Sequence, residues 1–545
     1  MRRRLFYLSS KRARIAASIY ERSEREDEMA DSKFTMDRRD VMKATAAAAG
    51  ALLMPEMGWA QAAPRKGGTL RVAMPYNPGA IDPMTGRNLT DLNTLYVVFD
   101  ALIDFDPRTL ELKPGLAKSW KFTDPKTLVL DLVEGAKFHD GTPFNGEAVK
   151  FNLERYKTSP RSNVKSDLAT LESVEVNSPT QVTLKLNRPN AGMPTILTNR
   201  AGLMVSPKSI QDAKDGNIDR APVGTGPFKF VSWQDNDNLQ VARNPDYWQK
   251  GLPHLDAISF KIINELPTAV RAVVAGEADL AINLQPAQKP IADRSKNVIA
   301  TASPSLVPFL AFMNYSKPPL DDVRVRQALN YAVNRDEINK IAAVGLGQPS
   351  SAILPKEHWA CDAATQNYYT YDPEKAKKLL AEAGHANGVE IETIGWADQL
   401  AMQRQEVIIS QLAKVGIRVK LTPMSPAQGV QSYMVEKKGA MFISPSSAYP
   451  DPSQFYESLF GKTALRNASG MELPGFRELL DATMEAQEQG ARKQAFVKLQ
   501  KFVNENALAF VHYISPSVSV RSQKVQNHQD SLISVPKLGG IWLQA

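Results

Sequence analysis

The sequence has 545 residues, 43% of them hydrophobic, which is long enough for two or three domains with substantial cores. Its formal net charge of +8 comes without a lysine-rich run or an interleaved basic and aromatic stripe, which argues against nucleic-acid binding. The single cysteine, Cys361, excludes an internal disulfide.

Residues 1–62 contain the features of an export leader. Paired arginines, Arg38-Arg39, precede a short apolar stretch from Ala44 to Met54, and Ala60-Gln61-Ala62 offers a cleavage site. The arginine pair favours the Tat route, but the next positions lack the Phe and Leu that Tat signals prefer, so Sec export stays open. We therefore expect an exported, periplasmic protein that begins near Ala63.

The charged segment ahead of this leader predicts no fold of its own. We expect translation to start at Met29 or Met36. Without residues 1–62, lysines and arginines fall from 66 to 54 and acidic residues from 58 to 49, which leaves a net charge of about +5. No cysteine stands at the cleavage site, so we expect no lipid anchor.

Short strands come first in the mature chain. Apolar runs or period-two alternation predict strands at 69–74, 128–132, 181–186 and 257–262. In the second half, Asp372-Pro373 predicts the start of a helix that Gly384 ends.

A strand at 389–394, a helix from about Gln399 to Val415 and a strand at 417–421 follow in that order. Strand, helix and strand over some 30 residues form a βαβ unit with a right-handed crossover. The sequence therefore predicts an α/β protein.

Four sequence blocks carry a family resemblance. They are GAKFHDGTPF at 135–144, GTGPFKFVSW at 224–233 with RNPDYW at 243–248, PPLDDVRVRQALNYA at 318–332, and AYPDP at 448–452. In this order they resemble the family 5 solute-binding proteins of ABC importers, which carry peptides, nickel, opines and related solutes.

The resemblance implies a two-lobed periplasmic-binding-protein fold (type II, cluster C) with an extra inserted small lobe. Lobe I would comprise residues 63–102, 219–305 and 516–545, the small lobe 103–218, and lobe II 306–515. The chain would cross between the large lobes near Ser305–Phe309 and Ser515–Ser517. Two crossings make a hinge that allows the lobes to close on a solute.

The resemblance also implies function and partners. We expect a monomer without a cofactor that captures a small or peptide-like solute and delivers it to an ABC permease in the cytoplasmic membrane. The solute would favour the closed state because it contacts both lobes only there.

Most residues in the four blocks have a structural interpretation. Gly224, Gly226 and Pro227 suit a tight turn whose backbone adopts conformations that other residues resist. A phosphate-binding loop is excluded because no Gly-Lys-Ser/Thr follows. His139-Asp140 is expected to cap a turn, and Asp321-Asp322 to begin a helix.

Candidate ligand contacts follow from the rule that loops at strand ends face the crevice of α/β lobes. They are Tyr76, Asn77, Asn199, Arg200, Gln285, Trp396, Ser446, Ser447, Tyr449 and Asp451.

One position departs from the family pattern. Peptide-binding relatives carry an aspartate three residues before the Asp-Pro turn, where it pairs with the ligand's ammonium group, and here that residue is Ala448. A buried ammonium needs a partner. Either another acid substitutes, with Asp451 as the candidate, or the solute is not an ordinary free-amine peptide; an opine, a modified peptide, a sugar derivative or another amphiphilic solute would fit.

Two alternatives compete with solute capture. None of the six histidines are spaced three or four apart as helix-borne metal ligands would be, although distant residues could still converge on nickel or a metal chelate. An exported enzyme finds no support, because the chain has no G-x-S-x-G or H-E-x-x-H motif.

Overall fold

The computed structural model describes residues 63–86, 89–446 and 449–545. The predicted leader, cleavage site and translation start concern residues 1–62 and lie outside the described residues. Within the described ranges, no helix combines the length and the apolar character needed to cross a membrane.

An 11-stranded mixed sheet forms the centre of the molecule, in the order β15-β14-β16-β12-β17-β11-β1-β10-β9-β8, with β13 paired to β17. Its strands are β1 (Thr69–Met74), β8 (Phe228–Gln234), β9 (Asn238–Arg243), β10 (Ala257–Ile262), β11 (Leu280–Leu284), β12 (Val298–Met313), β13 (Gln348–Pro349), β14 (Val389–Trp396), β15 (Ile417–Met424), β16 (Met441–Pro445) and β17 (Phe510–Ser522). The strands predicted at 69–74 and 257–262 are confirmed as β1 and β10.

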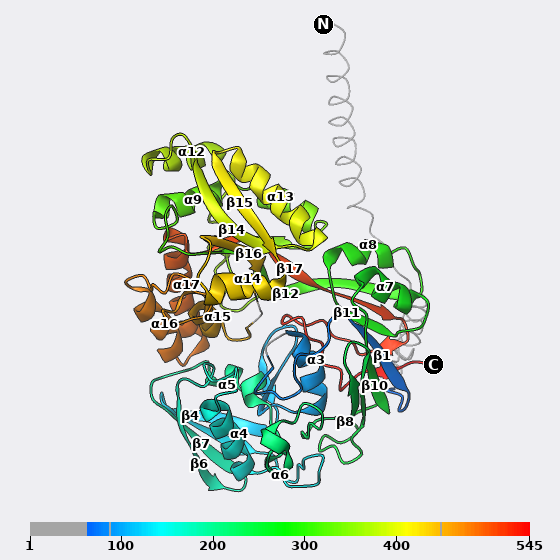
Figure 1. Cartoon of the computed structure of the whole chain (residues 1–545). Coiled ribbons are helices and arrows are strands. Elements are labelled where there is room, and N and C mark those ends of the chain that lie inside the picture. The colour runs from blue at the N-terminus through cyan, green and yellow to red at the C-terminus, as the bar shows by residue number, and fades with distance from the viewer. Residues whose placement is uncertain (1–62, 87–88, 447–448) are drawn as a thin grey trace, which may run out of the picture. The chain divides into compact units, whose positions relative to one another are not determined.

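Two long antiparallel strands, β12 and β17, connect the two halves of this sheet (Figure 1). Their pairing shifts register between Ser303 and Val307, and the Ser305 hydroxyl inside this interruption donates to the Ser515 carbonyl at 2.5 Å. Both expected crossings lie within these strands. The exact lobe boundaries stay a prediction, and we keep the lobe names for the residue ranges given above.

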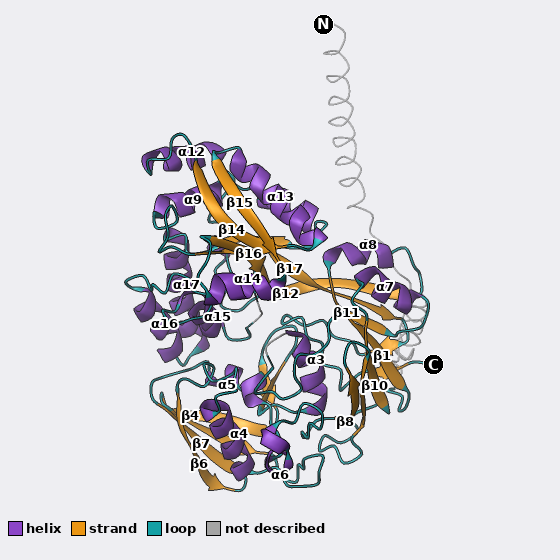
Figure 2. Ribbon diagram, in the orientation of Figure 1, coloured by secondary structure: helices purple, strands orange, loops and turns teal. Residues whose placement is uncertain are grey.

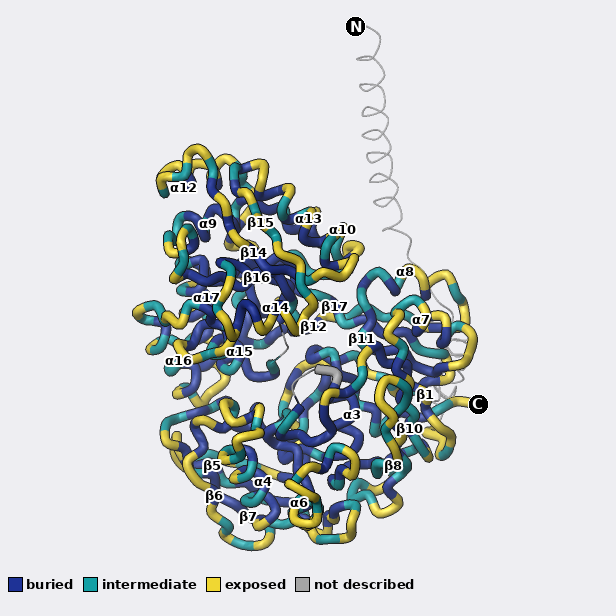
Figure 3. Tube along the Cα trace, in the orientation of Figure 1, coloured by how far each residue is buried: buried dark blue, intermediate teal, exposed yellow. Residues whose placement is uncertain are grey.

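Lobe II packs helices on both faces of its part of the sheet (Figure 2). Alternate residues of β12 point to opposite cores: Phe309 and Met313 join one hydrophobic cluster, while Leu310 and Phe312 join another. Figure 3 shows β16 buried along almost its whole length, whereas β14 alternates between buried and exposed residues in its first half. The helices are α9 (Val323–Tyr331), α10 (Arg335–Ala342), α11 (Ala363–Gln366), α12 (Pro373–Glu382), α13 (Gln399–Ala413), α14 (Pro426–Val430), α15 (Pro452–Phe460), α16 (Phe476–Glu485) and α17 (Gln489–Glu505).

The predicted βαβ unit of lobe II is confirmed. Asp372 accepts a hydrogen bond from the Lys375 amide at 2.9 Å and caps α12, which ends before Gly384 at φ +88°. Strands β14 and β15 are parallel, and α13 connects them. Gly416, at φ +92°, ends the turn after α13.

The small lobe contains a separate four-stranded antiparallel sheet in the order β4-β5-β7-β6 with its own hydrophobic core. Its elements are β2 (Ile103–Phe105), β3 (Leu112–Pro114), β4 (Ala117–Asp124), β5 (Thr127–Leu132), β6 (Leu171–Ser178), β7 (Gln181–Leu186), α4 (Gly146–Thr158), α5 (Met193–Ile196), η1 (Arg200–Gly202), α6 (Pro207–Asp212) and η2 (Lys214–Gly216). The strands predicted at 128–132 and 181–186 are confirmed as β5 and β7.

Lobe I completes its core with α3 and short segments from the end of the chain. The remaining elements are α3 (Leu89–Val98), α7 (Leu266–Val274), η3 (Pro286–Gln288), α8 (Lys289–Ala292), η4 (Gln431–Val435, in lobe II), β18 (Val525–Gln526) and β19 (Trp542–Leu543).

Gly224 and Gly226 were predicted to need unusual backbone dihedral angles, and this reason is wrong. Neither residue has a positive φ. Instead, the backbone at both positions lies against the end of α3: an added Cβ would stand 2.1 Å from the Val98 carbonyl oxygen at Gly224 and 2.6 Å from the Val98 carbonyl carbon at Gly226. Close approach of two backbones, not unusual dihedral angles, requires glycine here.

Candidate solute-binding site

The carboxyl ends of β14 and β16 place two unpaired polar groups at one edge of the lobe II sheet. Trp396 is the last residue of β14, and Ser446 directly follows β16. Neither the Trp396 indole nitrogen nor the Ser446 hydroxyl has a hydrogen-bond partner among the described residues. Ser446 is only 3% exposed. Buried polar groups are nearly always paired, so both positions are suited to a ligand.

A guanidinium that the sequence did not single out packs against the other core of lobe II, opposite the core that Trp396 joins. Arg404, in the second turn of α13, is 7% exposed and stands 4.1 Å above the Phe309 ring, which stacks on Tyr513 at 5.3 Å. Its Nε also has no partner among the described residues.

Tyr76 of lobe I lies within range of two charged residues of lobe II. Its side chain is 53% exposed, and its pKa is raised above the ordinary value, chiefly by burial and next by the charge of Asp398, while Arg404 lowers it. Asp398 is the N-cap of α13 and accepts from the Ala401 amide at 2.9 Å. Tyr76, predicted as a contact, therefore lies within electrostatic range of Asp398 and Arg404 on α13.

Tyr449 lies next to a second arginine of lobe II. Its hydroxyl accepts from Arg466 at 2.8 Å, and its ring stacks on Phe455 at 5.7 Å. Arg466, together with Arg200 of the small lobe, also lowers the pKa of Asp167, although burial raises that pKa to about 6 overall. Arg200 and Arg466 thus act on one carboxylate from opposite lobes.

Two other predicted contacts have local structural roles, and a third, Gln285, has none with its side chain. The Asn77 amide is engaged inside lobe I: it accepts from Trp233 and donates to Asp235 at 3.1 and 3.2 Å. Asn199 caps η1 by accepting from the amide of the next residue at 2.8 Å. Gln285 is half-buried at the start of η3 and makes no capping bond with its side chain. As solute contacts, these positions stay predictions.

The structure corrects the suggestion that Asp451 replaces the missing acid. Asp451 is fully buried, caps α15 through the Ser453 amide at 2.9 Å, and accepts from Arg492 at 2.8 and 3.0 Å. Because this carboxylate is buried and bonded to Arg492 and Ser453, it has no exposed lone pair for a ligand's ammonium group. Ser447 and Ala448 lie outside the described residues.

The small lobe and lobe II are in direct contact through residues 188–192 and the helix α16. The Ala191 amide donates to the Met484 carbonyl at 2.8 Å, and Arg188 pairs with Asp481 at 2.7 Å. Gly192 lies against the Asp451 carboxylate, since an added Cβ would stand 2.7 Å from Oδ2.

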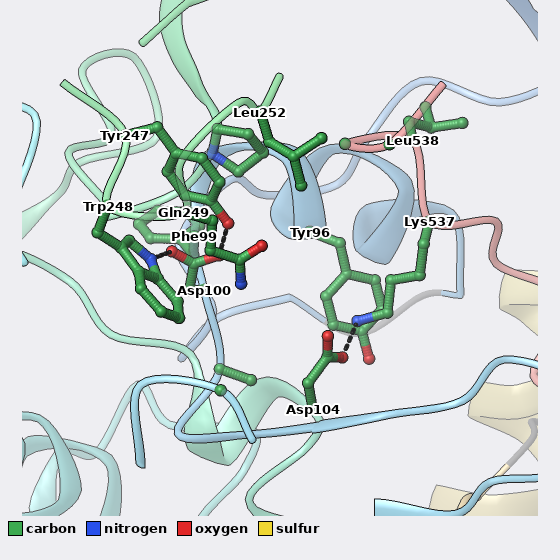
Figure 4. Close-up of a pocket in the computed structure, with 15 residues that line it drawn as sticks. Tyr96, Phe99, Asp100, Asp104, Tyr247, Trp248, Gln249, Leu252, Lys537 and Leu538 are labelled. Carbon is green, nitrogen blue, oxygen red and sulfur yellow. Dashed lines mark hydrogen bonds and ion pairs between the residues drawn. The ribbon is translucent and has the colours of Figure 1, made fainter. Parts of the chain in front are cut away.

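A cavity of about 190 Å³ lies elsewhere, between lobe I, the small lobe and the C-terminal segment (Figure 4). Asp100 accepts from Tyr247 at 2.9 Å and from Trp248 at 2.7 Å, and burial raises its pKa to about 6. Across the cavity Lys537 pairs with Asp104 at 2.9 Å. None of the ten predicted contacts line it.

The predicted turn role of His139-Asp140 is confirmed. The His139 ring contacts the Gly226 carbonyl at 2.9 Å, and Asp140 accepts from the Thr142 amide at 3.0 Å. No group of three His, Cys, Asp or Glu side chains that could hold a metal occurs in the described ranges.

His512 on β17 leads to a prediction about acid stability. It is fully buried, has no partner for either ring nitrogen among the described residues, and has a pKa lowered from 6.5 to about 3 by burial and by Arg335. Below about pH 6.5 the histidine therefore binds a proton in the unfolded chain but stays neutral in the folded protein. The free energy of unfolding is highest above that pH and falls as the pH drops.

Between about pH 7 and pH 5 the free energy of unfolding of the wild type should fall by about 2 kcal/mol more than that of the His512→Phe variant. Urea unfolding of the wild type and the variant at both pH values measures this. Equal losses in the two proteins would contradict it.

Comparison with known proteins places this geometry in a family. Residues 111–467 match the model of the "Bacterial extracellular solute-binding proteins, family 5 Middle". The glutathione-binding protein GsiB of Escherichia coli (strain K12) is 34% identical over 379 residues, which cover 68% of this chain and 71% of GsiB.

Solved structures share the fold. The periplasmic binding protein DppA of Helicobacter pylori, in complex with the peptide STSA, has a TM-score of 0.78 and 24% identity, with 88% of this chain and 99% of DppA covered. The binding protein AgaA of A. tumefaciens R10, in complex with agropinic acid, has a TM-score of 0.77 and 23% identity at the same coverage. The two-lobed α/β fold predicted from the sequence is thus confirmed. The chain belongs to the bacterial extracellular solute-binding proteins of family 5.

Proposed function

We propose that the mature chain captures a peptide-like solute between lobes I and II and delivers it to an ABC permease in the cytoplasmic membrane. The observation that carries this proposal is the family match over residues 111–467, on a chain whose sheet halves are connected through β12 and β17. A solute that contacts both lobes stabilises the closed state by that difference in contact energy. The protein returns its solute unchanged, acts as a monomer, and reaches the periplasm by the Tat route.

The solute is proposed to be a modified peptide or an opine rather than an ordinary free-amine peptide. Position 448 is alanine where peptide-binding relatives carry an acid, and Asp451 is occupied by Arg492. The similarity to a protein named for glutathione binding supports a modified peptide, because the glutamate of glutathione is linked through its side-chain carboxyl; its free ammonium group would need a partner other than residue 448. The proposed contacts are Tyr76, Asn77, Asn199, Arg200, Gln285, Trp396, Ser446, Ser447 and Tyr449.

Titration calorimetry of the mature chain against glutathione, its disulfide, unmodified dipeptides and tripeptides, and agropinic acid tests the proposal. We expect micromolar binding of a modified peptide or opine, recovery of that solute unchanged, and a smaller radius of gyration in solution scattering. Micromolar binding of ordinary peptides would contradict the solute class. A radius that no solute alters would contradict capture between the lobes.

A further inference from the structure

The proposed capture of a solute makes no use of the cavity of about 190 Å³ between lobe I, the small lobe and the C-terminal segment, because none of the proposed contacts line it. Its volume leaves room for far more than one water molecule. In Figure 4, Asp100 lies on one side of the cavity with Tyr247 and Trp248, and Lys537 lies on the other side with Asp104. The cavity therefore brings charged groups from three segments of the chain together.

The Asp100 carboxylate is held by hydrogen bonds but faces no cation. It accepts from the Tyr247 hydroxyl at 2.9 Å and from the Trp248 indole at 2.7 Å. Burial raises its pKa to about 6 overall, with a smaller contribution from the charge of Asp104, and no ion pair reaches it in the part of the chain that the structure describes. Because a buried carboxylate without a counter-ion is costly, Asp100 favours a bound cation.

Lys537 does not supply this cation. Its ammonium group pairs with Asp104 at 2.9 Å and lies 3.9 Å from the centre of the Tyr96 ring. Asp104 thus neutralises Lys537, and the charge of Asp100 stays uncompensated. The pKa of the Tyr247 hydroxyl is raised first by burial and then by the charges of Asp100 and Asp104, so this hydroxyl lies in the negative field of both carboxylates.

The rest of the lining favours an organic ammonium ion over a metal ion. Phe99, Trp248 and Leu252 supply apolar surface for carbon atoms. The Gln249 amide also lines the cavity and can accept a hydrogen bond from an N–H group. Calcium and magnesium take about six or more oxygen ligands, and the described residues hold no group of three acidic, histidine or cysteine side chains that could bind such an ion.

We infer that this cavity binds a small organic ammonium ion, whose N–H groups donate to Asp100 and whose carbon atoms lie against the apolar wall. The inference goes beyond the proposed function, because this second site needs no solute between lobes I and II. Asp100 belongs to lobe I and Asp104 to the small lobe, so the bound ion would contact both of these lobes.

The first test compares ethylammonium with ethanol, which have nearly the same size but differ in charge. The mature chain is labelled with fluorotryptophan, and the ¹⁹F resonance of Trp248 is assigned with Trp248→Phe. This resonance should shift in a saturable way with millimolar ethylammonium and not with ethanol. The absence of a saturable shift in the wild type, or an equal shift with ethanol, would overturn the inference.

The second test changes the charges around the cavity. Asp100→Asn should weaken the binding of ethylammonium by about tenfold or more, because the amide carries no charge. Lys537→Met leaves Asp104 without its partner and should strengthen the binding by about two- to fivefold. Asp246→Asn is the matched control and should bind as the wild type does, because Asp246 is exposed beside Tyr247 and does not line the cavity.

The other tryptophan resonances show whether each variant is folded. Wild-type affinity in a folded Asp100→Asn, or an equal loss in Asp246→Asn, would overturn the assignment of the site to Asp100. If Asp100→Asn does not fold, Lys537→Met decides, since unchanged or weaker binding in that variant contradicts an uncompensated negative charge in the cavity.

Discussion

Replacing Arg492 with Met should lower the free energy of unfolding by about 3–5 kcal/mol, because it leaves the buried Asp451 carboxylate without its counter-ion. The Asp451 side chain is 0% exposed and that of Arg492 7%, and two contacts of 2.8 and 3.0 Å join them. Arg492 also donates to the Thr483 carbonyl at 2.8 Å, so the substitution leaves a second buried acceptor unsatisfied.

A double variant separates the ion pair from simple packing. Asp451→Asn combined with Arg492→Met removes both charges and should be more stable than Arg492→Met alone. An exposed pair is the matched control: Lys420→Met breaks the pair of Lys420 with Glu392, at 3.7 Å and more than 60% exposed on both sides, and should cost less than about 1 kcal/mol.

Guanidinium unfolding followed by tryptophan fluorescence measures these differences. Trp359 is a suitable reporter because the Arg492 guanidinium lies 5.5 Å from its ring. A loss below about 1 kcal/mol in Arg492→Met, equal to that of the exposed control, would show that the buried pair is not required for lobe II.

The sequence predicted those parts of the fold whose signals are local. Strands such as β1, β7 and β10 follow from short apolar patterns, and the α12 helix follows from its cap and its terminal glycine. The family blocks predicted the two-lobed architecture because they are spread along the mature chain in a fixed order.

Features that depend on distant residues were missed or misread. Gly224 looked like a strained turn, but its need for glycine comes from Val98, more than a hundred residues earlier. Asp451 looked like a ligand acid, but Arg492 on α17 neutralises it. Arg404 was not singled out by the sequence, because its burial against Phe309 on β12 depends on packing between distant residues.

Gly192→Val should weaken solute binding by about tenfold to a hundredfold without unfolding either lobe. Its backbone, at φ −79° and ψ −10°, accepts any residue, so the substitution causes no backbone strain. The nearest atoms to an added Cβ all belong to Asp451, at 2.7, 2.8 and 2.9 Å, and Arg492 holds that carboxylate in place.

The valine side chain clashes only when the small lobe contacts lobe II. The substitution therefore raises the free energy of the arrangement in which these lobes touch and does not change that of a more open arrangement. Overpacking of this kind costs about 1–3 kcal/mol, and the apparent affinity falls with the population of the binding-competent state.

Gly490→Val is the matched control, because no atom lies within 4 Å of a Cβ at that position in α17. Solution scattering should give a larger radius of gyration for Gly192→Val than for the wild type. The free energy of unfolding without solute should be the same in both proteins. Wild-type affinity in Gly192→Val would mean that the small lobe and lobe II need not meet for the solute to be held.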